Sequence, residues 1–160
     1  MNHEIAPVWN KQSKILILGS FPSVKSREQE FFYGHPMNRF WKVLSLVLEC
    51  ELPITIEDKK NFLLKNHIAI WDVIASCRIK GSSDSSIQDV VPNDLKEILH
   101  KSNIQKIFVN GKTAEKLYNR YIYPKTNISA MVLPSTSPAN AAYSLDRLVS
   151  CYQIIKKSLI

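Results

Sequence analysis

Groups that could bind a ligand follow a short apolar run near the N-terminus. Residues 14–18 are mostly apolar and β-branched, which predicts a buried strand. Gly19 and Pro22 then form a tight turn that exposes backbone N–H groups, and Asn38 stands where an amphipathic helix begins. In α/β sheets, ligands bind outside the carboxyl ends of strands. Asn38 therefore has two interpretations, an amide that contacts a ligand or an N-cap that serves only its helix.

Further polar groups follow other predicted strands. Asp72 ends an apolar run, where a charge needs a hydrogen-bonding partner or a water-filled site, unless it caps a neighbouring loop. Asn110, Gly111 and Lys112 make a glycine turn from strand to helix, which presents free N–H groups to an anion. The spacing of a phosphate-binding P-loop is absent there. Residues 134–140 form a Pro/Ser-rich loop after the last strand.

A long loop is expected at residues 76–92, with Arg78, Lys80 and Asp84 among serines and glycine. Such loops are often only mobile turns. Because this one follows a strand at the same edge of the sheet as the first turn, a functional role is also open.

The elements that must position these groups alternate between strands and helices. Strands are predicted at residues 14–18, 68–74, 105–109 and 128–133. Helices are predicted at residues 38–49 and 57–66, and at three further segments that end near residues 101, 121 and 158. The order predicts an α/β fold of three layers, α/β/α, with a central four-stranded parallel sheet. We expect one domain, residues 1–160.

Composition narrows the class of protein. The chain has 21 Lys and Arg against 14 Asp and Glu, a net charge of +7 that favours polyanions. Its three cysteines lie far apart, which argues against a structural zinc or an iron–sulfur cluster and predicts reduced intracellular thiols. No apolar run approaches the ~20 residues of a membrane span, and residues 1–13 lack the apolar core of a signal peptide. We expect a cytoplasmic protein without membrane, metal or cofactor.

Two motifs then resemble a known family. The first motif has two parts: residues 19–23 match Gly-x-x-Pro-[Gly/Ser], and residues 35–41 match His-Pro-x-Asn-x-Phe-Trp. Together they resemble the uracil-DNA glycosylase superfamily, in particular its mismatch-specific uracil- and thymine-DNA glycosylases. Residues 133–138 match the superfamily's second motif, a Pro-Ser loop after the last strand. The resemblance covers nearly the whole chain and implies the same fold.

Two departures point to one branch. The third residue of the first motif, a catalytic Asn in the mismatch-specific enzymes, is Phe21, and the second motif opens with Leu133 rather than His or Asn. This combination is similar to the hypoxanthine-DNA glycosylase branch, as are residues 71–73 and 81–85. In that branch the Asn of His-Pro-x-Asn is catalytic, which corresponds to Asn38. The branch also lacks the four-cysteine cluster of other superfamily members, as does this chain.

The resemblance implies a monofunctional enzyme that flips a deaminated base out of double-stranded DNA and hydrolyses its glycosidic bond. Hypoxanthine is the expected base, with uracil or xanthine as lesser substrates, and the protein is expected to be a monomer. The expected base-binding residues are Gly19, Ser20, Phe21, Tyr33, Asp72 and Asp84. The expected DNA-binding residues are Asn110, Gly111, Lys112, Pro134, Ser135, Thr136 and Ser137.

Two other functions remain open. With apolar residues at Phe21 and Leu133, the chain could be a weak or inactive protein that only binds damaged DNA. The same crevice could also serve a small-molecule nucleoside hydrolase. The basic composition and the Pro/Ser loop favour DNA over free nucleosides.

Overall fold

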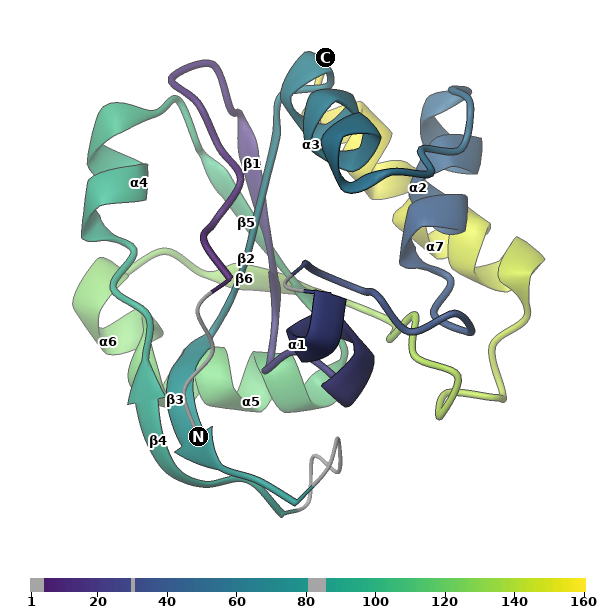
Figure 1. Ribbon diagram of the computed structural model, residues 1–160. Helices are drawn as coiled ribbons and strands as arrows, with labels where there is room; N and C mark the ends of the chain where they lie inside the picture. The colour runs from purple at the N-terminus through teal and green to yellow at the C-terminus, as the bar shows by residue number, and fades with distance from the viewer. Residues whose placement is uncertain (1–4, 30, 81–85) are drawn as a thin grey trace.

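A parallel sheet runs through the centre of the computed structural model, which describes residues 5–29, 31–80 and 86–160 (Figure 1). Its strands, in the spatial order β2-β1-β5-β6, are β1 (Ile15–Gly19), β2 (Ile68–Asp72), β5 (Lys106–Asn110) and β6 (Ala130–Leu133). All five residues of β1 are buried, because β1 has a strand on each side and helices on both faces. The predicted four-stranded parallel sheet and three-layer α/β/α fold are confirmed.

The helices cover both faces of this sheet. They are α1 (Val24–Gln29), α2 (Phe40–Leu48), α3 (Ile56–Lys65), α4 (Lys96–Lys101), α5 (Lys112–Tyr121), α6 (Tyr123–Thr126) and α7 (Leu145–Ser158). In Figure 1, α2, α3 and α7 lie on one side of the sheet and α4 and α6 on the other. Within the described ranges, none of the helices is both long and apolar enough to cross a membrane.

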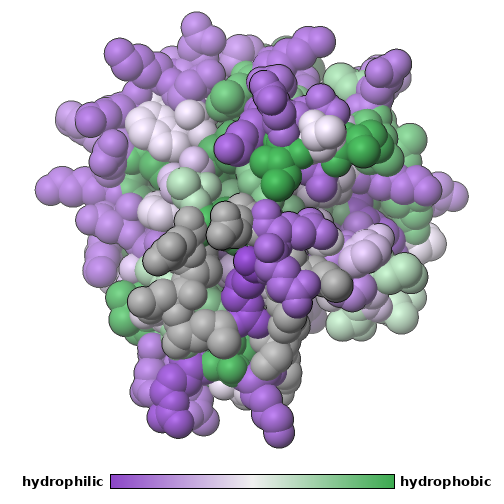
Figure 2. Space-filling model, viewed as in Figure 1, coloured by the Kyte–Doolittle hydropathy of each residue, from purple (hydrophilic) through white to green (hydrophobic). Residues whose placement is uncertain are grey.

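Alternate side chains of β1 belong to two separate hydrophobic cores. Ile15 and Ile17 pack with apolar residues of α2, α3 and α7. Leu16 and Leu18 point the other way and pack with residues of α4 and α5. The outer surface is mostly hydrophilic on the face shown in Figure 2, as expected for a chain with a net charge of +7.

The segment before β1 protects one edge of the sheet. Val8 and Ile70 exchange two backbone hydrogen bonds of 3.0 Å each, and the indole N–H of Trp71 donates to the carbonyl of Ile5. These contacts pair part of the open side of β2, which would otherwise present free backbone groups.

Two segments that lie largely outside the predicted strands and helices contain regular structure. Residues 20–36 include α1, which begins where the Ser23 hydroxyl accepts the N–H of Ser26 over 3.1 Å. Residues 76–92 include most of an antiparallel hairpin, β3 (Ile74–Arg78) with β4 (Gln88–Pro92). Register shifts in the hairpin and a positive φ of 54° at Asp89 disrupt the alternation that marks a strand. Residues 81–85, and with them Asp84, lie outside the described residues.

The parallel register brings the candidate residues together at one edge. Gly19 at the end of β1 is paired with Asp72 at the end of β2, and Asn110 at the end of β5 is paired with Leu133 at the end of β6. The four polar turns that follow these strands therefore share the carboxyl edge of the sheet.

Candidate active site

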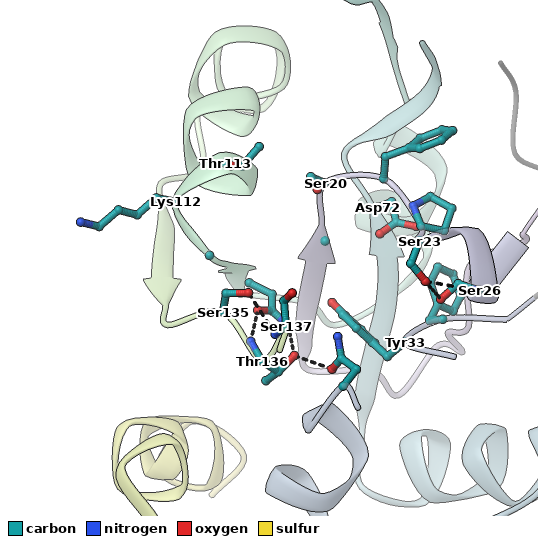
Figure 3. A pocket seen from close by; sticks show the side chains of 17 residues that line it. Ser20, Ser23, Ser26, Tyr33, Asp72, Lys112, Thr113, Ser135, Thr136 and Ser137 are labelled. Carbon is teal, nitrogen blue, oxygen red and sulfur yellow. Dashed lines mark hydrogen bonds between the residues drawn. The ribbon is translucent and has the colours of Figure 1, made fainter. Parts of the chain in front are cut away.

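A pocket of about 230 Å³ lies at this edge (Figure 3). It brings together twelve of the residues singled out from the sequence: Gly19, Ser20, Phe21, Tyr33, Asn38, Asp72, Asn110, Gly111, Lys112, Ser135, Thr136 and Ser137. Pro134 does not line it, and its carbonyl accepts a hydrogen bond of 2.7 Å from the hydroxyl of Tyr152 on α7.

The amide of Asn38 is held in one orientation. Its Oδ1 accepts the backbone N–H of Phe40 over 3.0 Å and the hydroxyl of Thr136 over 2.8 Å. An amide oxygen has two lone pairs and can accept two hydrogen bonds. Because both neighbours of this atom are donors, it is the oxygen of the amide, and the other terminal atom is the nitrogen Nδ2. Because no described residue accepts from Nδ2, its two N–H donors stay available to the pocket that Asn38 lines.

Asn38 is not the N-cap that the sequence suggested as an alternative. The N-cap position of α2 is Arg39, which makes no side-chain cap bond. Asn38 stands one residue earlier, yet its side chain still bonds the first helical N–H. The same oxygen thus serves the helix and fixes the amide at the pocket.

Thr136 connects this amide to the end of β5. Its side chain is fully buried, its hydroxyl accepts from Nδ2 of Asn110 over 3.1 Å, and its backbone N–H donates to Oδ1 of Asn110 over 3.1 Å. Gly111 follows with a φ of +95°, and a Cβ there would lie 3.1 Å from Cβ of Ser135. The turn after β5 therefore requires glycine for its backbone and for the approach of the loop after β6.

Tyr33 provides an aromatic ring inside the pocket. The ring stacks on Phe40 with centroids 3.9 Å apart and planes at 16°. Phe40 thus covers one face of the ring, and Tyr33 also lines the pocket. The backbone of Tyr33 has a φ of +52°, a conformation that non-glycine residues adopt rarely and often at functional sites.

The hydroxyl of Tyr33 is buried and has no hydrogen bond of normal geometry within the described part of the chain. Burial and the nearby Asp72 raise the pKa of Tyr33, and the amide of Asn110 opposes them only in part. The phenol therefore stays protonated and can donate to a ligand.

Asp72 is the buried carboxyl of the site, with only 4% of its surface exposed. Burial raises its pKa from 3.8 to about 7, so both protonation states exist near neutral pH. A Cβ on Gly19 would lie 2.5 Å from Oδ1 of Asp72 and 3.2 Å from the hydroxyl of Tyr33. Glycine at position 19 thus leaves the space into which the carboxyl and the phenol reach (Figure 3).

The turn after β1 is held by the strand connection beside it. The backbone N–H groups of Val73 and Ile74 donate to the carbonyls of Gly19 and Ser20 over 2.8 and 3.1 Å. Phe21 packs against the core on the α4 and α5 side, with Arg27 over its ring at 5.3 Å. The apolar residue at position 21 therefore shapes the pocket wall.

Five pocket residues were not among those predicted: Pro22, Ser23, Ser26, Phe32 and Thr113. Ser26 is buried, and its hydroxyl accepts the N–H of Gly34 over 2.8 Å, which closes the loop between β1 and α2. The serines three residues apart at positions 23 and 26 are a helix-start signal that could have revealed α1.

In the described ranges, no group of three or more His, Cys, Asp or Glu side chains could hold a metal ion. The described residues that line the pocket supply side-chain amides, hydroxyls, the carboxyl of Asp72 and the ammonium of Lys112.

Comparison with known proteins identifies the family of this chain. The model of the Uracil DNA glycosylase superfamily matches residues 6–156. A protein of Methanosarcina acetivorans named hypoxanthine DNA glycosylase is 37% identical over 147 residues, which cover 88% of this chain and 89% of that one. A protein of the same name from Methanosarcina barkeri is 32% identical over 108 residues, 66% of this chain and 68% of its own.

A solved structure has the same fold. The solution NMR structure of a candidate uracil DNA glycosylase from M. acetivorans superposes with a TM-score of 0.80 at 28% identity and covers 97% of this chain and 98% of its own. The match extends over all four strands and the turns that follow them. The expected resemblance is confirmed: the chain belongs to the Uracil DNA glycosylase superfamily and is a DNA glycosylase, a hydrolase of N-glycosidic bonds.

Proposed function

We propose that this protein removes hypoxanthine from DNA by hydrolysis of the glycosidic bond, with xanthine and uracil as lesser substrates. The observation that carries the proposal is the fixed amide of Asn38, whose N–H donors have no acceptor among the described residues and face a pocket shared with Asp72 and Tyr33. The names of the two Methanosarcina relatives support the choice of hypoxanthine.

Asn38 acts on the leaving base in this proposal. Glycosidic cleavage passes through an oxocarbenium-like sugar and leaves negative charge on the departing base. Donors fixed in place before the reaction stabilise such charge without reorganisation. Since Oδ1 of Asn38 is bonded to Thr136 and Phe40, the donors on Nδ2 are the groups that contribute, rather than a carbonyl that orients water.

Asp72 distinguishes the base. Hypoxanthine and xanthine carry a hydrogen on N1 and uracil carries one on N3, whereas N1 of adenine is an acceptor. The ionised carboxyl of Asp72 accepts that N–H and repels the lone pair of adenine. Guanine has the same N1–H, so its exclusion depends on its stable pairing with cytosine, which makes its extrusion from the duplex more costly than that of a mispaired base.

Tyr33 stacks on the extruded base through the ring face opposite Phe40. The loop after β6 and the turn after β5 contact the DNA backbone through Ser135, Ser137 and the backbone N–H of Lys112, whereas the N–H of Gly111 donates to the Leu133 carbonyl over 2.8 Å. These contacts with phosphates make the affinity fall with salt.

The enzyme is proposed to be monofunctional, without lyase activity. Cleavage of the DNA strand needs an amine that attacks the sugar. Lys112 is the only lysine among the pocket residues, and its side chain points away from the cavity in Figure 3. Hydrolysis with Asn38, Asp72 and backbone donors uses no such amine.

The test uses labelled duplexes that carry one hypoxanthine, xanthine or uracil, treated with alkali to cut at abasic sites. Wild type, Asn38→Ala and a control, Asn61→Ala, are compared; Asn61 is an exposed residue of α3. We expect wild type and Asn61→Ala to release hypoxanthine faster than xanthine or uracil. Asn38→Ala should not release hypoxanthine.

The other outcomes decide between the alternatives. Release of uracil alone would contradict the hypoxanthine preference. Salt-sensitive binding without release of any base would favour a protein that only recognises damage. Release of hypoxanthine from free inosine, with little salt dependence, would favour a nucleoside hydrolase.

A further inference from the structure

The side chain of Arg39 binds the loop that follows β6. Its Nη1 donates to the carbonyl of Tyr143, and its Nη2 donates to the carbonyls of Ser137 and Asn140 over 3.2 and 3.1 Å. Its backbone N–H donates to the carbonyl of Thr136 over 3.1 Å. One residue at the start of α2 thus holds four carbonyls of residues 136–143.

All the hydrogen-bond partners of this guanidinium within the described ranges are neutral carbonyls. None of the ion pairs there includes Arg39. The planar fork of a guanidinium suits several fixed acceptors at once, whereas the ammonium of a lysine binds as a single point. The bonding therefore serves to set the shape of the loop rather than to neutralise a charge.

No regular secondary structure holds this loop. Residues 134–144 contain no helix or strand, and Ala139, Ala141 and Ala142 are exposed and add nothing to either core. Thr136 is also held by its two bonds to Asn110. The rest of the loop is held by the bond from Tyr152 to the Pro134 carbonyl, by the bond of 3.0 Å from Nδ2 of Asn140 to the Ser135 carbonyl and by the packing of Tyr143 against the core on the α7 side. Without the guanidinium of Arg39, residues 137–143 would lose their bonds to the start of α2, and Thr136 would keep its bonds to Asn38, to Asn110 and to the Arg39 backbone N–H.

The loop in turn fixes Asn38. Thr136 lies at its start, and the Thr136 hydroxyl is one of the two donors that orient the Asn38 amide. We infer that Arg39 is a positioning residue: it holds residues 136–143 against the start of α2, so that Thr136 keeps the N–H donors of Asn38 directed into the pocket. For its effect on turnover, this inference rests on the function proposed above.

The first test is kinetic. Arg39→Ala acts through the bond from Thr136 to Asn38, so it should lower kcat for hypoxanthine release by up to about tenfold, the loss expected when that bond is removed, with a smaller change in KM. Arg39→Lys, which keeps the charge, should remain impaired. Guanidinium ions at millimolar concentration should partly restore Arg39→Ala, whereas sodium at the same ionic strength should not.

Arg147→Ala is the matched control. Arg147 is exposed and lies over the ring of Tyr143 at 4.0 Å, so this variant loses the same charge beside the same loop but no carbonyl bond. Its kcat should stay near that of wild type. An equal loss in Arg147→Ala and Arg39→Ala would show that charge explains the effect and would overturn the inference.

A double-mutant cycle tests the route through Thr136. In a Thr136→Val background, Arg39→Ala should lower kcat by less than about threefold, because the bond through which it acts is already absent. Full additivity of the two losses would contradict the inference even if each single variant is impaired.

A measurement without catalysis separates this inference from the proposed function. The side-chain NH₂ resonances of Asn38, identified by their loss in Asn38→Ala, should be distinct in wild type and in Arg147→Ala. In Arg39→Ala, or in Arg39→Lys if the alanine variant does not fold, they should move toward the values of an exposed amide. Unchanged resonances would overturn the inference, whereas an inactive wild type with this shift would overturn only the proposed function.

Discussion

The hydroxyl of Thr136 donates to Oδ1 of Asn38 over 2.8 Å and joins two segments that lie 98 positions apart in the chain. The same hydroxyl accepts from Asn110 at the end of β5. One buried side chain thus links the last loop, the third strand of the sheet and the start of α2. This link gives the Asn38 amide a single orientation.

Replacement of Thr136 tests the link. Thr136→Val keeps the shape of the side chain and removes the hydroxyl, which leaves Nδ2 of Asn110 without its acceptor. We expect a loss of about 1–3 kcal/mol in the free energy of unfolding and a fall of about tenfold in kcat, the rate effect of about 1.4 kcal/mol. Thr136→Ser keeps the hydroxyl and should retain most of the stability and most of the kcat of wild type. Equal activity in the two variants would argue against the link.

Asp72 makes base recognition depend on pH. As pH rises through about 7, the carboxyl loses its proton and changes from a group that can donate to N1 of adenine to one that repels it. Inhibition by free hypoxanthine relative to free adenine should therefore increase across this range. Asp72→Asn presents a donor and an acceptor at every pH. The ratio of inhibition by hypoxanthine to inhibition by adenine should therefore be lower in this variant and should not change with pH. The same slope in both proteins would exclude Asp72 as the cause.

Asp72 also makes stability depend on pH. The pKa of its carboxyl rises from 3.8 to about 7 on folding, so the folded state keeps a proton that the unfolded state has already released. The stability from this group is complete below pH 4 and is lost as pH rises to about 7, by on the order of 4 kcal/mol. Denaturant unfolding of wild type and Asp72→Asn at pH 5 and pH 8 measures this. From pH 5 to pH 8, the free energy of unfolding of wild type should fall relative to that of Asp72→Asn. A constant difference between the two proteins would contradict the raised pKa of Asp72.

Gly19 is required by the space that Asp72 occupies. A Cβ at position 19 would lie 2.5 Å from Oδ1 of Asp72, so Gly19→Ala should destabilise the fold by about 1–3 kcal/mol. Combining it with Asp72→Ala removes the clashing oxygen and should make the double variant more stable than the sum of the two changes predicts. Chemical denaturation of wild type, the two single variants and the double variant gives the coupling free energy between positions 19 and 72. Strict additivity would show that the added Cβ does not clash with Asp72.

The sheet and the shared edge could be predicted because local pattern determines them. The run at residues 15–18 is apolar throughout, and such runs form strands that are covered on both faces. Parallel strands carry their following turns to one edge, so Gly19, Asp72 and Asn110 had to lie near one another. The motif resemblance added the order in which these turns occur.

The contacts that orient the site could not be predicted in this way. The bonds of Thr136 to Asn38 and of Arg39 to the last loop join residues far apart in sequence, and no periodicity encodes such pairs. The stacking of Tyr33 on Phe40 depends on a positive φ at Tyr33 that its residue type does not favour. The short helix α1 and the β3–β4 hairpin were missed because polar residues and register shifts hide their patterns.

The most direct test of the account is the single-turnover release of hypoxanthine by wild type and by Asn38→Asp. An aspartate at position 38 keeps an oxygen for Thr136 and Phe40 but replaces the N–H donors of Nδ2 with a second acceptor. The account predicts a fall in rate of at least about 100-fold, the size seen when a single donor to a developing anion is removed. A rate equal to or above that of wild type would contradict the role of Asn38 as a donor to the leaving base.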